Sequence, residues 1–257
     1  MKSFEHIAVI NSILATDNAE QASAQEQMAV ERLPFTVRVV RNEESLYKAV
    51  MIRQAAYARH VPEFAQKLKN PESNDYDRGS MILLAESKLD GSPVGTIRVQ
   101  SNRYRSLAIE QSAELPLAMH GENIVEATRL AVSEGRVGRV TKVVLIKALY
   151  LYCLEANIHW VIAGARPPLD RQYDAFLMDD LYQGRFIPLR HAGNIPHRIL
   201  ALDVPGARAR WEQAGHPLLD FMCHTHHPDI DLSNADYSIW SRSARPAEMP
   251  NRAAASA

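Results

Sequence analysis

The feature of the sequence that most constrains its fold is a series of short apolar, β-branched segments that alternate with amphipathic helical segments. Strand patterns cover residues 35–40, 81–85, 94–99, 124–132, 159–163, 185–190 and 198–203. Helical patterns cover residues 42–60, 139–156 and 167–181. This order predicts an α/β (α+β) chain in which helices cover both faces of one mixed central sheet.

Patterning is strong in the middle of the chain and weak at both ends. We therefore divide the 257 residues into an N-terminal extension (residues 1–33), a central domain (residues 34–205) and a C-terminal extension with a disordered tail (residues 206–257). Because 46% of the residues are apolar, the chain has enough apolar surface to bury a core of ordinary size.

Composition excludes several classes of function. A net charge of −1 gives no overall attraction to nucleic acid. The longest apolar run, residues 143–154, is interrupted by Lys147 and is shorter than the roughly 20 residues that cross a bilayer. The first residues lack the apolar run of a signal peptide, so we expect a cytoplasmic protein with no transmembrane segment.

The two cysteines of the chain exclude a disulfide-dense scaffold and a four-cysteine zinc site. Cys153 falls on the apolar face of the predicted helix at 139–156, so we expect it in the core. The stretch Cys223-His-Thr-His-His227 has irregular ligand spacing and lies between prolines, which favours a polar loop over a metal site. We expect no metal and no tightly bound cofactor.

A charged residue lies on an otherwise apolar stripe of the first predicted helix. The stripe repeats at spacings of four, three and four, and consists of Leu46, Val50, Arg53 and Tyr57. An arginine in this position either extends to solvent or binds a buried carboxylate. Asp75 and Asp77, just before a strand, are either a turn and cap motif or the carboxylates that Arg53 needs.

Charged residues also interrupt two predicted strands. Arg98 lies in the strand at 94–99, where an edge position would explain it, and Glu126 and Arg129 lie in the strand at 124–132. With a strand period of two, Glu126 and Thr128 share a face with Leu130, and Arg129 points to the other face. Because buried charges are costly unless paired, we hypothesise a single network. It joins three arginines to three acids: Arg53, Arg98 and Arg129 to Asp75, Asp77 and Glu126.

Basic residues gather around the start of the long helix, at Arg136, Arg139, Lys142 and Lys147. They are either a solvated helix face or a docking surface for an acidic partner. Gly138 lies in the loop just before this predicted helix. That loop is either a plain connection or a cradle whose backbone N–H groups, with the helix N-terminus, bind phosphate.

The order of these residues resembles that of the acyl-homoserine lactone autoinducer synthases, in which an arginine–aromatic helix, a Tyr-Asp pair, a strand arginine and a Glu-x-Ser/Thr-Arg-Phe-x-Val strand follow one another. The resemblance to the N-acyl amino acid synthases is closer and covers roughly residues 35–205. It is carried by Glu126-Ala-Thr-Arg-Leu-Ala-Val132, Tyr150-Leu-Tyr-Cys153 and Ala165-Arg166-Pro167. Leu130 replaces the usual Phe, and the segment before the first strand is longer, which argues against a lactone product.

The resemblance implies a GCN5-related N-acyltransferase fold. It also implies transfer of a long-chain fatty acyl group from acyl carrier protein to the α-amine of an amino acid, with the acyl-phosphopantetheine thioester as a substrate. The apolar groove for the acyl tail would lie between the long helix and the strands that follow it. Two alternatives stay open: an acyl-homoserine lactone synthase that uses S-adenosylmethionine, and a non-catalytic protein that binds acyl carrier protein or lipid.

The resemblance further implies roles for individual residues. Glu126 is the expected general base, and Thr128 or a backbone N–H at the strand end stabilises the thioester oxygen. Arg53 and Arg98 either hold the amino-acid carboxylate or lock the acidic residues. The remaining substrate-binding residues are Tyr57, Asp75, Asp77 and Arg129. The residues expected to bind the carrier and its pantetheine arm are Arg136, Gly138, Arg139 and Lys142.

Overall fold

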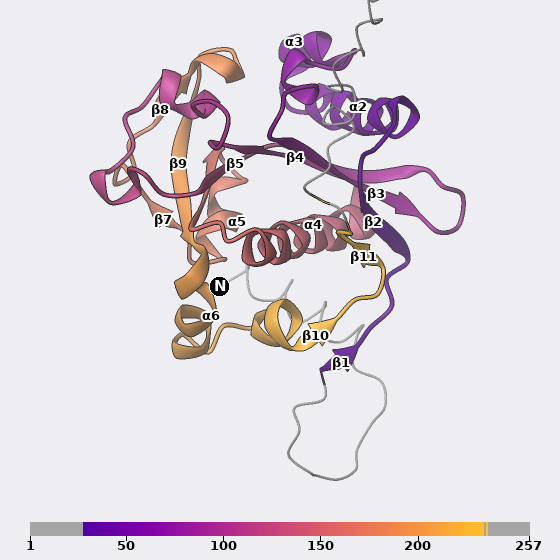
Figure 1. The fold of residues 1–257 in the computed structure, drawn as a ribbon. Helices are drawn as coiled ribbons and strands as arrows, with labels where there is room; N and C mark the ends of the chain where they lie inside the picture. Colours follow the sequence, from indigo (N-terminus) through magenta and orange to yellow (C-terminus); the bar gives the residue numbers. More distant parts are fainter. Residues whose placement is uncertain (1–27, 234, 236–257) are drawn as a thin grey trace, which may run out of the picture.

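The structure is a computed structural model that describes residues 28–233 and residue 235. Most of the expected N-terminal extension and the expected disordered tail lie outside the described residues. Within them, one large sheet forms the centre of the chain and helices lie on both sides of it (Figure 1).

The central sheet has nine strands in the order β11-β2-β3-β4-β5-β6-β9-β7, with β8 paired to β9. Its strands are β2 (Phe35–Val39), β3 (Ser80–Ser87), β4 (Pro93–Ser101), β5 (Ile124–Val132), β6 (Trp160–Ala165), β7 (Asp179–Asp180), β8 (Ile187–Leu189), β9 (Ile195–Asp203) and β11 (Ile230–Asp231). Strands β2 to β5 are antiparallel neighbours, whereas β5 and β6 are parallel. The predicted mixed sheet is therefore confirmed.

Helices α2 (Glu43–Ala58) and α4 (Gly135–Glu155) cover opposite faces of the sheet (Figure 1). Helix α2 begins where the Asn42 side chain accepts a hydrogen bond of 2.8 Å from the Ser45 N–H, as a helix cap requires. Apolar residues alternate along the strands, so that one set packs on α2 and the other on α4. The sequence thus builds two apolar layers on one sheet.

Helix α4 lies unusually close to the sheet. A Cβ atom at Gly95 of β4 would lie 2.5 Å from the Thr141 Cγ2 atom on α4. A Cβ atom at Gly138 would lie 1.7 Å from the Ser133 carbonyl oxygen, so this position also needs a glycine. The helix begins at Gly135, four residues before the predicted start, which places Gly138 inside its first turn.

The predicted helix at residues 167–181 is wrong in most of its length. The structure has only the short helix α5 (Asp170–Asp174), after which Leu177 takes a φ of 58° and the chain continues into β7. Arg198 of β9 explains the change, because it binds both Asp174 and Asp180 and so fixes the chain beside the sheet. The predicted strand at 185–190 is confirmed only over the residues of β8.

The segment at residues 204–233 packs against α4 and the sheet. Helix α6 (Val204–Gln213) brings Trp211 to a ring distance of 5.0 Å from Tyr150 of α4. The π-helical turn η6 (Asp220–His224) and strand β10 (Thr225–His226) follow, and β10 pairs with β1 (Ala29–Val30). Cys153 is buried in the core, as expected.

Short helices connect the larger elements. They are α3 (Pro62–Ala65), η1 (Gln66–Leu68), η2 (Ser73–Asp75), η3 (Ala108–Gln111), η4 (Leu117–Met119) and η5 (Arg190–Ala192). Among the described residues, no helix combines the length and the hydropathy that crossing a bilayer demands. Two of these turns, η2 and η5, carry residues of the site described next.

Candidate active site

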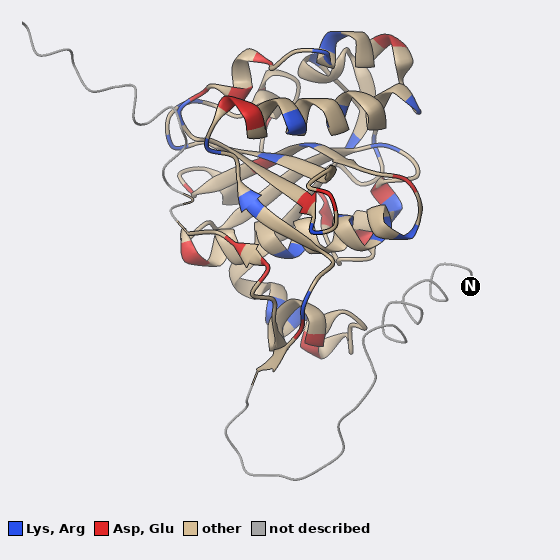
Figure 2. Ribbon diagram, turned by 90° about the vertical axis from the view of Figure 1, so that its right-hand side faces the viewer, with Lys and Arg blue, Asp and Glu red and all other residues tan. Residues whose placement is uncertain are grey.

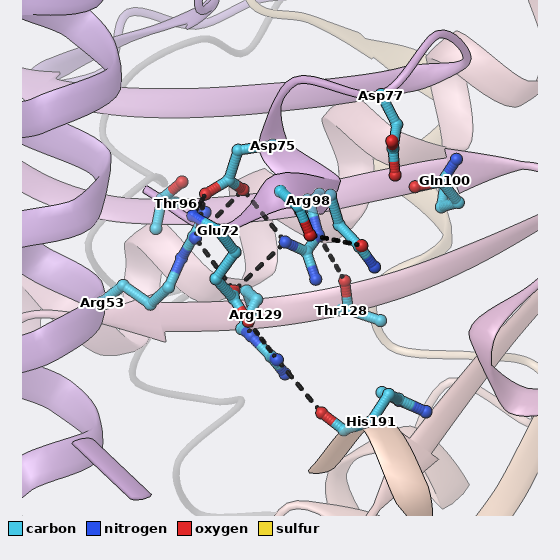
Figure 3. A network of polar contacts seen from close by, with 12 residues as sticks. Arg53, Glu72, Asp75, Asp77, Thr96, Arg98, Gln100, Thr128, Arg129 and His191 are labelled. Atoms are coloured by element: carbon cyan, nitrogen blue, oxygen red, sulfur yellow. Dashed lines mark hydrogen bonds and ion pairs between the residues drawn. The ribbon is translucent and has the colours of Figure 1, made fainter. Parts of the chain in front are cut away.

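Two buried arginines meet one buried carboxylate on the α2 side of the sheet. The Arg53 Nη1 atom donates to both carboxylate oxygens of Asp75, at 3.1 and 2.9 Å. The Arg98 Nη1 atom donates to Asp75 Oδ1 at 3.0 Å, and its Nε atom donates to Thr128 Oγ1 at 3.1 Å (Figure 3). The predicted stripe on α2 thus places Arg53 inward, against an acid, and not in solvent.

A second carboxylate of the network, Glu72, was missed by the sequence analysis. Arg129 donates to its two oxygens from Nε and Nη2, both at 2.7 Å. Arg98 and Arg53 reach the same carboxylate at 3.1 and 3.4 Å. Burial alone would raise the pKa of Glu72, but the hydrogen bond and charge of Arg129 and the charges of Arg98 and Arg53 lower it to about 2.

The spacing of Glu72 and Asp75 was the signal that could have revealed this site. The Glu72 N–H donates to Asp75 Oδ2 at 2.8 Å across the turn η2, so both carboxylates point to the same side. Asp77, which the prediction used instead, lies outside the network and pairs with Arg105. The reason is geometric, because the chain leaves the 3-10 turn after Asp75 and turns Asp77 away (Figure 3).

Arg129 lies on the same side of the sheet as Thr128, which contradicts the predicted alternation. Its φ of 55° breaks the period of β5, and the register with β4 shifts between Thr96 and Arg98. Leu130 consequently packs on the α4 side instead of sharing a face with Glu126. One residue of irregular backbone thus brings the third arginine into the network.

Aromatic residues cover the Arg129 guanidinium from the α2 side. Its Cζ atom lies 5.2 Å from the centre of the Phe64 ring, which is a cation–π contact. The Tyr57 ring lies 5.9 Å from the same phenylalanine. Burial would lower the pKa of Arg129, but its hydrogen bonds to Glu72 and Tyr57 and their charges raise it, so the guanidinium stays charged.

Glu126 is fully buried beside the network and belongs to a separate pair. Its Oε2 atom accepts from the Ile109 N–H at 3.0 Å, and its Oε1 atom lies 3.2 Å from the His191 Nε2 atom. Burial raises the pKa of Glu126 to about 7. Burial and the charge of Arg129 lower the pKa of His191 to about 4. The hypothesis that Glu126 binds the arginines directly is therefore wrong, because His191 and a backbone amide are its neighbours.

No periodic pattern points to His191, which lies in the short turn η5. The fold brings it to Glu126 because Arg129 Nη2 donates to the His191 carbonyl oxygen at 3.3 Å (Figure 3). Arg129 therefore connects the turn that carries Glu72 to the turn that carries His191. Glu72 and His191, the two residues that the sequence did not reveal, both accept a hydrogen bond from Arg129 Nη2.

A cleft opens where strands β5 and β6 separate. The two parallel strands are paired from Ile124 and Trp160 to Ala127 and Ala163, and not beyond. The cleft has a volume of about 80 Å³. It is lined by Tyr57, Val61, Phe64, Ala127, Thr128, Arg129, Gly164, Arg166, Leu189, His191, Ala192, Ile195 and His197. The lining contains two arginines and two histidines, and it contains no acidic residue.

A wholly apolar cavity lies on the α4 side of the same strands and has room for about 20 Å³. Its walls come from β5, β6, α4 and the later segments, and include Tyr150, Phe176, Trp211 and Met222. Ala127 lines both this cavity and the polar cleft. The small side chain of Ala127 is thus the point where the two spaces approach each other.

The start of α4 carries three of the four predicted basic residues. Arg136 and Arg139 are exposed, Lys142 is half-buried, and Gly138 is buried beneath them. Burial, with the charge of Arg139, lowers the pKa of Lys142. Figure 2 shows basic and acidic residues interspersed along the helices and loops on the side of the molecule that it presents.

Lys147, the fourth predicted member of the basic cluster, is buried, which corrects that prediction. Its Nζ atom donates to the carbonyl oxygens of Phe221 and Thr225 and lies 2.9 Å from His227 Nδ1. The lysine therefore holds the C-terminal segment on α4. It faces inward because it lies on the buried stripe of the helix.

The histidines near Cys223 point in different directions. His227 faces Lys147, whereas His224 lies 3.0 Å from Asp220 and 3.3 Å from the Arg208 guanidinium. Across residues 28–233, no three histidine, cysteine or acidic side chains converge as metal ligands would. The stretch contains the end of η6 and the strand β10, so it is regular structure and not the predicted polar loop.

Comparison with known proteins bears on the fold. No protein-family model and no curated protein matches the sequence. Among solved structures, FeeM, an N-acyl amino acid synthase from uncultured soil microbes, is similar with a TM-score of 0.52 and 18% identity, over 70% of this chain and 96% of FeeM.

Two further solved structures give lower scores. BjaI, a CoA-dependent acyl-homoserine lactone synthase, has a TM-score of 0.49 and 17% identity over 75% of this chain and 93% of its own. An acyl-CoA N-acyltransferase from Pseudomonas aeruginosa has a TM-score of 0.45 and 15% identity over 65% of this chain and 98% of its own. The likeness to FeeM confirms the expected acyltransferase-type fold.

Proposed function

We propose that this protein is an N-acyltransferase that moves a fatty acyl group from a carrier thioester to the α-amine of an amino acid. The observation that supports it most is the position of Ala127, between a polar cleft beside Glu126 and His191 and a wholly apolar cavity. Such a junction suits a reaction that joins an apolar tail to a polar acceptor. The fold shared with FeeM is consistent with this chemistry.

The acyl donor would enter where β5 and β6 separate. Its carbonyl carbon would lie near Thr128. Its tail would pass Ala127 and push apart the walls of the apolar cavity, whose volume is about 20 Å³ before the tail enters. Thr128 Oγ1 accepts from Arg98 Nε, which leaves its own hydroxyl hydrogen free to donate to the carbonyl oxygen. A donor at this place stabilises the charge that the oxygen gains in the tetrahedral intermediate.

The acceptor would lie in the polar cleft with its carboxylate at Arg166. Arg53 and Arg98 are the less suitable partners, because Asp75 already engages both. Arg166 lines the cleft, is exposed, and has no carboxylate within ion-pair distance among the described residues. The sequence left two roles open for Arg53 and Arg98, namely to hold the amino-acid carboxylate or to lock the acidic residues. Their contacts with Asp75 favour the second role.

The chemical steps balance without a further reactant. The ammonium group of the amino acid loses one proton to the Glu126–His191 pair, and the neutral amine attacks the thioester carbon. The new C–N bond forms as the C–S bond breaks, and the nitrogen gives up its second proton to the leaving thiolate of the carrier, which becomes a thiol. Arg129 and Glu72 take no part in bond changes, and Arg129 holds the turn η5 that carries His191.

The test is a product analysis with purified protein. Long-chain acyl carrier protein is incubated with each amino acid in turn and, separately, with S-adenosylmethionine, and products are identified by mass spectrometry. An N-acyl amino acid supports the proposal. A homoserine lactone would replace it with the lactone synthase alternative, and tight carrier binding without any product would favour a non-catalytic binding protein.

The carrier would dock on the exposed arginines at the start of α4, since acyl carrier protein is acidic. The double variant Arg136→Glu, Arg139→Glu should raise KM for acyl carrier protein at least about tenfold more than KM for the same acyl group on CoA. Arg185→Glu, at another exposed site, is the matched control. Equal changes in both KM values would argue against a carrier-specific surface.

A further inference from the structure

Resting on the function proposed above, we infer that His191 is the group that takes the proton from the amine, and that Glu126 is a positioning residue that acts through His191. The sequence resemblance assigns the proton to Glu126. The structure separates the two residues by their access to the cleft. His191 therefore becomes the catalytic residue of the pair.

Access is the first argument. Glu126 has 0% of its surface exposed and is not part of the cleft lining, whereas the His191 side chain is 12% exposed and lines the cleft. The Ile109 N–H occupies the Oε2 atom of Glu126. A proton from a bound amine therefore meets the imidazole before it can reach the carboxylate.

The orientation of the imidazole is the second argument. Its Nε2 atom lies 3.2 Å from Glu126 Oε1, although the two atoms are not aligned as a hydrogen bond, and its Nδ1 atom is buried and has no hydrogen-bond partner among the described residues. A small rotation of the ring that points Nε2–H at the carboxylate leaves the free lone pair of the neutral imidazole on Nδ1. In that rotamer the acid orients the second nitrogen of the base.

The charges around the pair are the third argument. The groups that face the imidazole are Glu126, Arg98, Arg129 and His197. Arg98 and Arg129 disfavour a positive charge on the ring, so His191 stays neutral at neutral pH and is free to accept a proton. Among the described residues, Glu126 is the acid within ion-pair distance of the ring, and its carboxylate compensates the imidazolium that forms during the reaction.

The two residues titrate in different pH ranges. Burial raises the pKa of Glu126 to about 7 and lowers the pKa of His191 to about 4. As the pH rises through about 7, Glu126 loses its proton, and the pair reaches the form with a neutral imidazole beside a carboxylate. The rate should therefore rise with pH over this range and then level off.

Chemical rescue is the decisive experiment. His191→Ala should lower kcat about 100-fold or more with little change in KM for the donor. Added imidazole should raise the kcat of His191→Ala at least about tenfold, and the pH dependence of this increase should follow the titration of free imidazole. His226→Ala, at an exposed position, is the matched control and should keep the activity of the native protein.

Glu126→Gln gives a complementary readout. It should lower kcat about tenfold or more, show no rescue by imidazole, and move the acid limb of the pH profile to lower pH. If His191→Ala kept activity within about threefold while Glu126→Gln abolished it, the inference would be overturned in favour of Glu126 acting directly. Circular dichroism of each variant shows whether the fold is kept.

A measurement without substrate separates this inference from the proposed function. The ¹⁵N NMR signals of the His191 ring at pH 7.5 should show a neutral imidazole with its proton on Nε2, and Glu126→Gln should shift the midpoint of its titration. A charged ring or a proton on Nδ1 would overturn the dyad even if the protein makes an N-acyl product. Absence of product with the expected NMR signals would instead refute the proposed reaction.

Discussion

Arg129 and Glu72 are joined by two parallel hydrogen bonds of 2.7 Å each, from Nε and Nη2 to the two carboxylate oxygens. This is a strong geometry for an arginine and a carboxylate, because two parallel donors of the planar group bind both oxygens at once. Arg129 also binds the carbonyl oxygen of His191, so the same side chain links the turns η2 and η5. The site depends on this one connection.

Glu72→Gln should destabilise the protein by about 3 kcal/mol at pH 7, because it leaves the buried Arg129 guanidinium without its main counter-ion. The folded-state pKa of Glu72, about 2, lies below its ordinary value of 4.5. The stabilisation is therefore present above pH 4.5 and is lost as the pH falls through 2. Urea unfolding between pH 7 and 2 measures it. A Glu72→Gln variant with the pH dependence of the exposed control Glu44→Gln would contradict the prediction.

Glu126 should have the opposite effect on stability. Its folded-state pKa of about 7 lies above the ordinary 4.5, so its contribution is fully present below pH 4.5 and is lost as the pH rises through 7. The free energy of unfolding of Glu126→Gln, relative to that of the native protein, should rise by about 3 kcal/mol between pH 4.5 and pH 8. Denaturant titrations of both proteins at these two pH values measure the difference. If the substitution had the same effect at pH 4.5 and at pH 8, the Glu126 carboxylate would titrate with its ordinary pKa.

Met222→Ala should lengthen the preferred acyl chain by about three carbons, because it removes three heavy atoms from the wall of the apolar cavity. The measurement is kcat/KM across a series of acyl chain lengths. Met51→Ala changes an exposed methionine of α2 and should leave the preference as it is. An unchanged optimum in Met222→Ala would place the acyl tail outside this cavity.

Arg166→Gln should raise KM for the amino acid at least about tenfold and change kcat less, because a charged partner of the carboxylate is lost. The effect should disappear for an acceptor amine that has no carboxylate. Arg171→Gln, at a nearby exposed position, serves as the control. If both acceptors responded equally to Arg166→Gln, the arginine would not recognise the carboxylate.

Lys147→Met should destabilise the protein by about 3 kcal/mol, because it leaves the carbonyl oxygens of Phe221 and Thr225 buried without a donor. Limited proteolysis should then cut near residues 220–227 earlier than in the native protein. Lys142→Met, on the same helix, should change neither the unfolding midpoint nor the cleavage rate by a comparable amount. Protection equal to that of the native protein would show that packing alone holds this segment.

Most of the fold follows from periodicity. The strands at 35–40 and 94–99 and the helix at 42–60 repeat their apolar residues often enough to identify the element and its buried face, and the strand at 124–132 does so up to Thr128. The helix at 167–181 fails, because Arg198 draws its acids to the sheet edge. A contact with a distant strand overrides a local helical preference there.

By itself, the sequence determined the order of the main elements and the two-sided covering of the sheet, and it singled out Arg53, Arg98 and Glu126 as charges that need a partner or a function. These depend on patterns that repeat within one element. Only the tertiary structure decided that Glu72 replaces Asp77 in the network, that Arg129 turns to the face of Thr128, and that His191 meets Glu126. The physical reason is that one positive φ and two short turns have no period to detect, and their partners lie up to 65 residues away, as for Glu126 and His191.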